Sequence, residues 1–213
     1  MNEVGTFYKA GELDFSKVVP VYQEAFSGWP WYEVSKCVDD SRVQRCAGGL
    51  SRVAMNEICT PCGNKPSQPA YEASELIERF TMLEATRPTS WYVESVGDDP
   101  ALVGLAWTAP PEQIAREKYS ANPEMQDWLT NELGDEPIIW LDEVFADKKV
   151  RPKDNLVNFR SMTRGFMAAL DNTQLAYRTI SPAMVRAAEK NFNVTPTNNV
   201  PDKRALLQIG GEL

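Results

Sequence analysis

The sequence predicts an α/β (α+β) fold in which a mixed, mostly antiparallel central sheet carries helices on both faces. Two strand-like runs within residues 91–109 are joined by a Gly-Asp-Asp-Pro turn, which is typical of a hairpin. Strands and helices alternate from residue 137 onward, which is typical of βαβ units. A four-cysteine segment, residues 33–68, separates two N-terminal helices. The 213 residues therefore predict a single domain over 1–213 with a small Cys-rich insertion at 33–68.

The N-terminal part predicts a strand followed by an amphipathic helix. Residues 4–9 are strand-like, and residues 14–26 place apolar side chains at helical spacing. Asp14 or Ser16 can cap this helix, because both side chains accept hydrogen bonds from free backbone N–H groups. An aromatic corner follows the helix and contains Trp29, Trp31 and Tyr32.

The middle of the chain predicts a second helix, a hairpin and a polar helical segment. Residues 71–84 form an amphipathic pattern with Leu76 and Phe80 on its apolar side. The hairpin of residues 91–109 comes next. Residues 110–133 are polar and predict two short helices separated at Pro123.

The C-terminal part alternates between strands and helices. Residues 137–146, PIIWLDEVFA, are the most strand-like run of the chain. Ser181 and Pro182 are typical of the first residues of a helix. The elements predicted after the 137–146 strand are a helix at 156–170, a strand at 174–180, a helix at 181–192 and a strand at 203–210.

Charge and composition exclude several classes of function. The formal net charge of −8 argues against sequence-independent binding to nucleic acid, which requires a basic surface. The chain contains no histidine, which excludes histidine-based triads and histidine metal ligands. Any acid–base chemistry must therefore use carboxylates, Tyr, Lys, Cys or water.

The N-terminus and the hydropathy pattern predict a cytoplasmic protein. No apolar run approaches the ~20 residues of a membrane span, so we expect no membrane partner. The first fifteen residues are acidic and contain neither the basic nor the apolar region of a signal peptide.

The four cysteines predict a structural zinc site. Cys37, Cys46, Cys59 and Cys62 have the spacing C-x8-C-x12-C-x2-C, and the Cys59/Cys62 pair with Gly63 has the shape of a zinc knuckle. Four thiolates complete a tetrahedral zinc site without histidine and leave no open position for a substrate. Two alternatives stay open, a redox C-x-x-C pair and unrelated buried or free thiols.

The order of the elements and one motif resemble the GNAT (GCN5-related) superfamily of acyl-CoA N-acyltransferases. The resemblance covers most of the chain, and its specific part is residues 140–155, WLDEVFADKKVRPKDN. This run looks like the family's fourth strand and the pyrophosphate loop that opens its third helix. The resemblance implies a GNAT-like sheet, acetyl-CoA as the donor substrate and an amine as the acceptor.

The same resemblance implies the residues of a cofactor site. Acetyl-CoA would lie against the fourth strand and against the helix N-terminus that follows, whose free N–H groups attract phosphate. The residues expected to contact it are Val144, Phe145, Ala146, Arg151, Lys153, Asn155 and Leu156. The pyrophosphate loop is degenerate, because Asp154 and Leu156 stand where the family pattern has glycines.

Catalytic roles are also assigned by resemblance. Glu143 matches the glutamate that deprotonates the acceptor amine, and the backbone N–H at or near Val144 would bind the oxyanion. The family's helix-four tyrosine is missing, since Ala187 stands there, and Tyr177 is the nearest tyrosine. The aromatic corner of Trp29, Trp31 and Tyr32 would line the acceptor site, or it packs against the cysteine segment.

Alternatives to these assignments follow from the residues themselves. Strand alternation places Asp142 on the face opposite Glu143. Both carboxylates could lie at a solvated strand end, or pair with Arg160 or Arg164. The missing glycines and the missing tyrosine favour a second function, a non-catalytic GNAT-like binding or interaction protein. A third is a zinc-knuckle protein that binds nucleic acid or protein and has no acyl-CoA site.

Overall fold

The computed structural model describes the chain in nine ranges, which are residues 5–27, 33–38, 45–51, 68–131, 133–147, 159–179, 181–192, 194–197 and 205–210. The elements in chain order are β1 (Thr6–Lys9), α1 (Phe15–Phe26), β2 (Ser35–Val38), β3 (Arg45–Ser51), β4 (Gln68–Pro69), α2 (Ala73–Thr86), β5 (Thr89–Val96), β6 (Asp99–Ala109), α3 (Pro111–Lys118), α4 (Pro123–Asn131), β7 (Ile138–Ala146), α5 (Phe159–Ala169), β8 (Leu175–Thr179), α6 (Pro182–Asn191), β9 (Val194–Thr197) and β10 (Ala205–Ile209).

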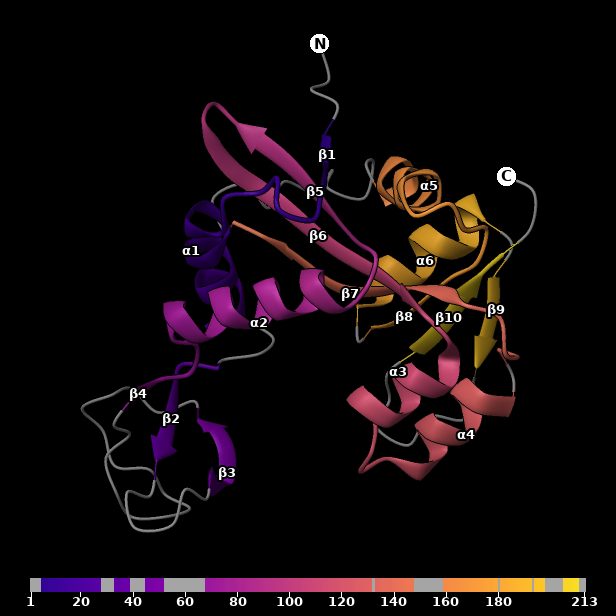
Figure 1. Cartoon of the computed structure of the whole chain (residues 1–213), viewed down its shortest axis with the longest axis horizontal. Coiled ribbons are helices and arrows are strands. Elements are labelled where there is room, and N and C mark those ends of the chain that lie inside the picture. The colour runs from indigo at the N-terminus through magenta and orange to yellow at the C-terminus, as the bar shows by residue number, and fades with distance from the viewer. Residues whose placement is uncertain are drawn as a thin grey trace.

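A seven-stranded mixed sheet forms the centre of the molecule (Figure 1). Its strand order is β1-β5-β6-β7-β8-β10-β9. The β7–β8 pair is parallel, and each other pair in this sheet is antiparallel. The predicted mixed, mostly antiparallel sheet is therefore confirmed.

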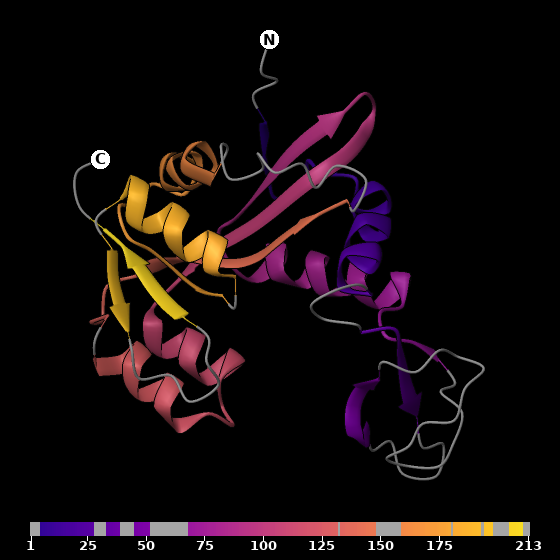
Figure 2. The same ribbon diagram turned by 180° about the vertical axis from the view of Figure 1, so that it is seen from behind.

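Helices cover both faces of the sheet, as the sequence predicts. Helices α5 and α6 bury one face, with Phe166 and Tyr177 in the centre of that core. Helices α1 and α2 bury the other face around Phe80 and Trp91. Helices α3 and α4 share this second face and pack on Trp140. Helix α2 lies in front of the sheet in Figure 1, and α6 lies in front in the reverse view of Figure 2.

Local sequence signals explain where several of these helices begin. The Asp14 side chain accepts a hydrogen bond from the Ser16 N–H at 3.0 Å, so Asp14 is the N-cap of α1. Ser181 caps α6, and Pro182 occupies its first position, where a missing N–H costs nothing. The polar stretch of residues 110–133 divides into α3 and α4, and Pro123 begins the second helix.

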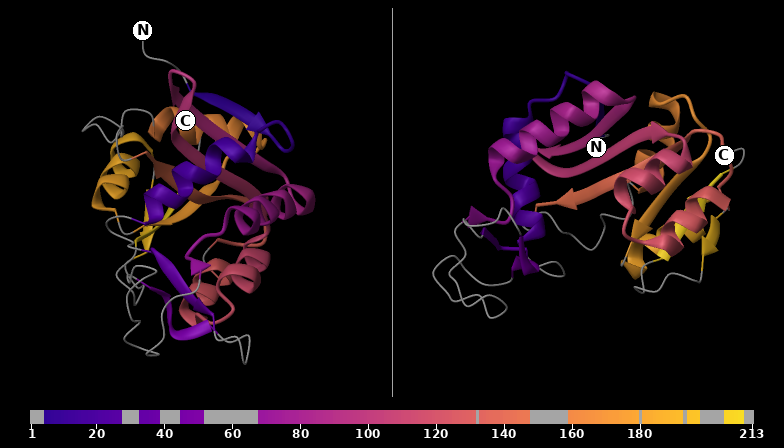
Figure 3. Two further views of the ribbon diagram at one scale, coloured as in Figure 1. Left: turned by 90° about the vertical axis from the view of Figure 1, so that its left-hand side faces the viewer. Right: turned by 60° about the horizontal axis from the view of Figure 1, so that its bottom comes forward.

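The structure contains four short strands that the sequence did not predict. One is β9, which contains Pro196 and forms the edge of the main sheet, where proline is tolerated because one side of the strand needs no partner. The other three are β2, β3 and β4, which form a small separate sheet in the order β3-β2-β4. This small sheet belongs to the predicted insertion and lies beyond the ends of α1 and α2 (Figure 3).

Close packing between β6 and α5 depends on a glycine. A Cβ atom at Gly104 would lie 2.8 Å from the Met162 sulfur and 3.3 Å from the Phe166 ring. Gly104 pairs with Val144 across the β6–β7 ladder. The absence of a side chain at Gly104 thus lets α5 lie close to the strands that position residues 142–146.

In the part of the chain that the structure describes, no helix is both long and apolar enough to cross a membrane.

Candidate functional site

Strand β7 carries the candidate site, and a β-bulge determines where its side chains point. On the facing strand β6, Ala106 pairs with Leu141 and Leu105 pairs with Glu143, so Asp142 is an extra residue without a partner of its own. A bulge of this kind interrupts the alternation of side chains between the two faces. The prediction that Asp142 and Glu143 point to opposite faces is therefore wrong.

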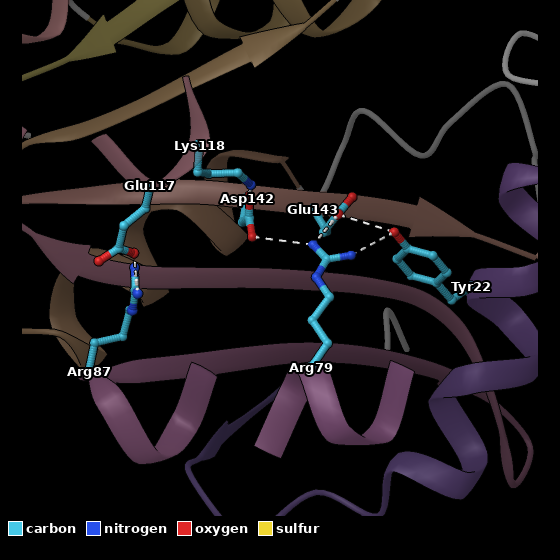
Figure 4. Close-up of polar contacts among 7 residues, drawn as sticks. All are labelled: Tyr22, Arg79, Arg87, Glu117, Lys118, Asp142 and Glu143. Atoms are coloured by element: carbon cyan, nitrogen blue, oxygen red, sulfur yellow. Dashed lines mark hydrogen bonds and ion pairs between the residues drawn. The ribbon is translucent and has the colours of Figure 1, made fainter. Parts of the chain in front are cut away.

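Both carboxylates point to the face covered by α1, α2 and α3 (Figure 4). Arg79 of α2 donates a hydrogen bond to Glu143 Oε1 at 2.8 Å, and the same guanidinium nitrogen lies 3.7 Å from Asp142 Oδ2. Lys118, the last residue of α3, contacts the other oxygen of Asp142. The two acidic side chains are thus each paired with a cation.

This pairing replaces the alternatives that the sequence left open for the two carboxylates. Their side chains are only 3% exposed at Asp142 and 15% exposed at Glu143, so they do not form a solvated strand end. Their cationic partners come from α2 and α3 rather than from Arg160 or Arg164 of α5, which covers the opposite face.

Tyr22 of α1 completes the network. Its hydroxyl donates a hydrogen bond to Glu143 at 3.2 Å and accepts one from Arg79 at 3.1 Å. Burial, together with the negative charge of Glu143, raises the pKa of the Tyr22 hydroxyl. Tyr22 therefore stays protonated near neutral pH and acts as a donor to Glu143.

Arg79 stays charged in this environment. Burial alone would lower the pKa of Arg79, but the oxygens of Tyr22 and Glu143 outweigh that effect and raise it above its ordinary value. The Arg79 side chain is nevertheless 41% exposed, in contrast to the two carboxylates that it contacts. It lies on the solvent side of the network.

The sequence did not predict that Arg79, Lys118 and Tyr22 belong to the site. Arg79 is the single basic residue in the helix predicted at 71–84, and it stands between Leu76 and Phe80 of the apolar side. A lone cation at the border of a buried helix face was the available signal. Nothing in the local sequence connects it to Glu143, which lies 64 positions away.

Tyr177 of β8 lies in the core covered by α5 and α6, on the face of the sheet opposite to Glu143. It is 1% exposed in the core beneath α6, and its hydroxyl donates a hydrogen bond to the Met184 carbonyl at 3.1 Å. Burial raises its pKa, so the hydroxyl stays protonated.

The predicted cofactor residues on β7 lie directly after the bulge. Val144 packs toward α5 and α6, whereas Phe145 is buried beside Tyr22, with the centroids of the two rings 5.0 Å apart. Ala146 is the last residue of the strand. Arg151, Lys153, Asn155 and Leu156 lie outside the described residues, as do Trp29, Trp31 and Tyr32.

Two of the four cysteines lie in the small sheet. Cys37 is in β2 and Cys46 is in β3, and these two strands pair antiparallel with an irregularity between Lys36 and Val38. Cys59 and Cys62 lie outside the described residues. Within the described ranges, no three metal-ligating side chains gather in one place.

Strand β7 pairs with its parallel neighbour β8 only near the start of β7. The β7–β8 register covers Ile139 with Leu175 and Trp140 with Ala176, and in the described structure it goes no further. Strand β7 continues to Ala146 and runs toward α1, as the right-hand view of Figure 3 shows. Among the described strands, the second half of β7, which holds the bulge, therefore pairs with β6 alone.

Known proteins share this fold at low sequence identity. No model of a protein family matches the sequence, and no curated protein does. Among solved structures, a histone acetyltransferase HPA2 and related acetyltransferase from Corynebacterium glutamicum is 14% identical, with a TM-score of 0.53 and coverage of 99% of this chain and 98% of that one.

Two further structures extend the comparison. The mosquito arylalkylamine N-acetyltransferase like 5b is 9% identical, with a TM-score of 0.52 and coverage of 98% of this chain and 100% of that one. The AHL synthase LasI is 11% identical, with a TM-score of 0.50 over 97% of this chain and 89% of that one. The chain thus has the GNAT-like fold that the sequence predicts.

Proposed function

We propose that this protein is an acyl-CoA-dependent N-acyltransferase that moves an acetyl group from acetyl-CoA to a primary amine. The main support for the proposal is that β7 separates from its parallel neighbour β8 after two pairs of residues. Where parallel strands separate, backbone N–H and C=O groups of the strand edge are left to bind another molecule. An extended amide-containing chain, such as the pantetheine arm of CoA, has the groups to bond such an edge.

The direction of the backbone groups supports this proposal. Asp147 donates its N–H to Ala101 O, toward β6. Because N–H groups alternate along a strand, we infer that Val144 and Ala146 direct theirs to the opposite edge, where β8 does not pair. A donor at Val144 could stabilise the oxyanion of a tetrahedral intermediate.

The proposed reaction is direct attack of a neutral amine on the thioester carbonyl in a ternary complex. Glu143 takes the proton of the attacking amine, directly or through one water molecule. The carbon–nitrogen bond forms, the carbon–sulfur bond breaks, and CoA leaves as a thiolate that water protonates. We assign no acid role to Tyr177, because its hydroxyl is already bonded in the core.

The cofactor contacts expected beyond β7 belong to the same proposal. Arg151, Lys153, Asn155 and Leu156 precede α5, and we propose that they meet the pyrophosphate. The aromatic residues Trp29, Trp31 and Tyr32 follow α1 and would contact the acceptor.

Calorimetric titration with acetyl-CoA tests the proposal. We expect binding that weakens at least tenfold in Arg151→Glu, with Arg186→Glu, at an exposed residue of α6, as the control. Turnover against a panel of primary amines then tests the chemistry. An absence of binding at millimolar acetyl-CoA would instead favour a non-catalytic binding protein with this fold.

We also propose a structural zinc ion in the insertion, held by Cys37, Cys46, Cys59 and Cys62. The pairing of β2 with β3 supports the proposal, because it brings the backbones at Cys37 and Cys46 onto neighbouring strands. Four thiolates would close the coordination sphere and stabilise the segment rather than react.

A further inference from the structure

The bulge of β7 concentrates negative charge on one face of the sheet. It turns Asp142 and Glu143 to the same side, and both side chains are largely buried. Two carboxylates this close repel each other, and burial increases the cost of their charge. The arrangement therefore requires cationic partners.

The two partners have different roles. Lys118 contacts only Asp142 within the network of Figure 4, and its side chain is 29% exposed. Arg79 bridges Asp142 and Glu143 and also donates to Tyr22. If Arg79 left, Asp142 would keep its ion pair with Lys118, whereas Glu143 would keep the Tyr22 hydroxyl and the more distant positive charge of Lys118.

Arg79 is also the partner that another cation can replace most directly. Its side chain extends from α2 and is 41% exposed, compared with 29% for Lys118. A cation from solvent can therefore take over its contacts, so that neither carboxylate is left buried and unpaired. Removing Lys118 from the nearly buried Asp142 would cost more.

Charge balance determines what could take the place of Arg79. The cations Arg79 and Lys118 compensate Asp142 and Glu143, so the network is neutral as it stands. An anion would add an uncompensated charge, and a cation added beside Arg79 would leave an excess of positive charge. Replacement of the guanidinium by another nitrogen cation keeps the network neutral.

We propose that Asp142, Glu143 and Tyr22 form a binding site for an alkylammonium or alkylguanidinium group, which the Arg79 guanidinium fills from within the same chain. The inference rests on the proposed function only in identifying this ligand with the acceptor. Arg79 then competes with the acceptor for Glu143, and Glu143 becomes available as a base only when Arg79 has moved.

Binding of small cations, without any acyl donor, tests the inference. Titrate guanidinium and n-propylammonium chlorides at millimolar concentration into the wild type and Arg79→Met, at constant ionic strength, and follow the affinity by NMR. We expect at least tenfold tighter binding of both cations to Arg79→Met. The matched control, Arg116→Met in exposed surface of α3, should bind as the wild type does.

A second variant identifies which carboxylate binds the cation, and a third provides the comparison if Arg79→Met does not fold. Adding Glu143→Gln to Arg79→Met should abolish the gain, because one charge of the site is lost. If Arg79→Met does not fold, Arg79→Lys provides the comparison. Both cations should then bind at least threefold more tightly than to the wild type, because the lysine ammonium cannot bridge the two carboxylates as the planar guanidinium does. Equal affinity in the wild type and in whichever variant folds would overturn the proposal.

The result is independent of acyl transfer. Tighter cation binding in a protein that fails to acetylate any amine would support the cation site and contradict the enzymatic proposal. Acetylation with unchanged cation affinity would support the enzyme and contradict the role of Arg79.

Discussion

Asp142 and Glu143 are consecutive residues of one strand, yet their carboxylates meet the same guanidinium, that of Arg79. The bulge at Asp142 makes this possible, because it places two successive side chains on one face. The pair lies where β7 has already parted from β8. Buried acid groups and a strand edge that no described strand pairs thus occur on the same short segment.

Glu143 is expected to be needed for turnover but not for donor binding. In Glu143→Gln, kcat should fall about 100-fold, as for loss of a general base, with the affinity for acetyl-CoA unchanged. Steady-state kinetics and calorimetry measure the two quantities. Glu136→Gln, an exposed residue ahead of β7, serves as the control. Unchanged kcat in Glu143→Gln would remove the base from the mechanism.

Asp142 and Lys118 should show coupled effects on stability. Asp142→Leu leaves Lys118 facing an apolar side chain and should lower the free energy of unfolding by roughly 2 kcal/mol, less than for a fully buried pair because Lys118 is partly exposed. The double variant Asp142→Leu, Lys118→Met should recover most of that loss. Urea denaturation of the four proteins in the cycle measures the coupling, and additive losses would contradict it.

Gly104→Ala should destabilise the packing of α5 on the sheet. The added methyl group would lie 2.8 Å from the Met162 sulfur, so the free energy of unfolding should fall by about 1–3 kcal/mol. Gly210→Ala is the control, since its nearest neighbouring atom lies 4.0 Å away. Urea denaturation measures both, and equal stability of the two variants would mean that Met162 moves aside freely.

The insertion should bind about one zinc ion per chain, as four thiolates form one tetrahedral site. Elemental analysis of the purified protein measures the ratio, and serine at Cys59 or Cys62 should abolish it. Fully folded, metal-free protein would contradict the zinc site and leave the redox pair or free thiols as the alternatives.

Local sequence was enough to predict most of the fold. Hydrophobic periodicity located α1, α2, α5, α6 and the β5–β6 hairpin, because each buries an apolar face whose spacing is visible in the chain. Asp14, Ser181 and Pro123 marked helix boundaries through their own chemistry. The short strands of the insertion and β9 lacked such a signal, since they are two to seven residues long and two of them contain proline.

The sequence by itself determined the mixed sheet and excluded histidine chemistry, and it predicted a site around Glu143. Only the tertiary structure decided that Asp142 joins Glu143, and that Arg79, Lys118 and Tyr22 meet them from three different helices. The physical reason is that a bulge depends on pairing with β6, and an ion pair across 64 positions depends on how α2 packs on the sheet. Neither feature can be predicted from the periodicity of a single strand or helix.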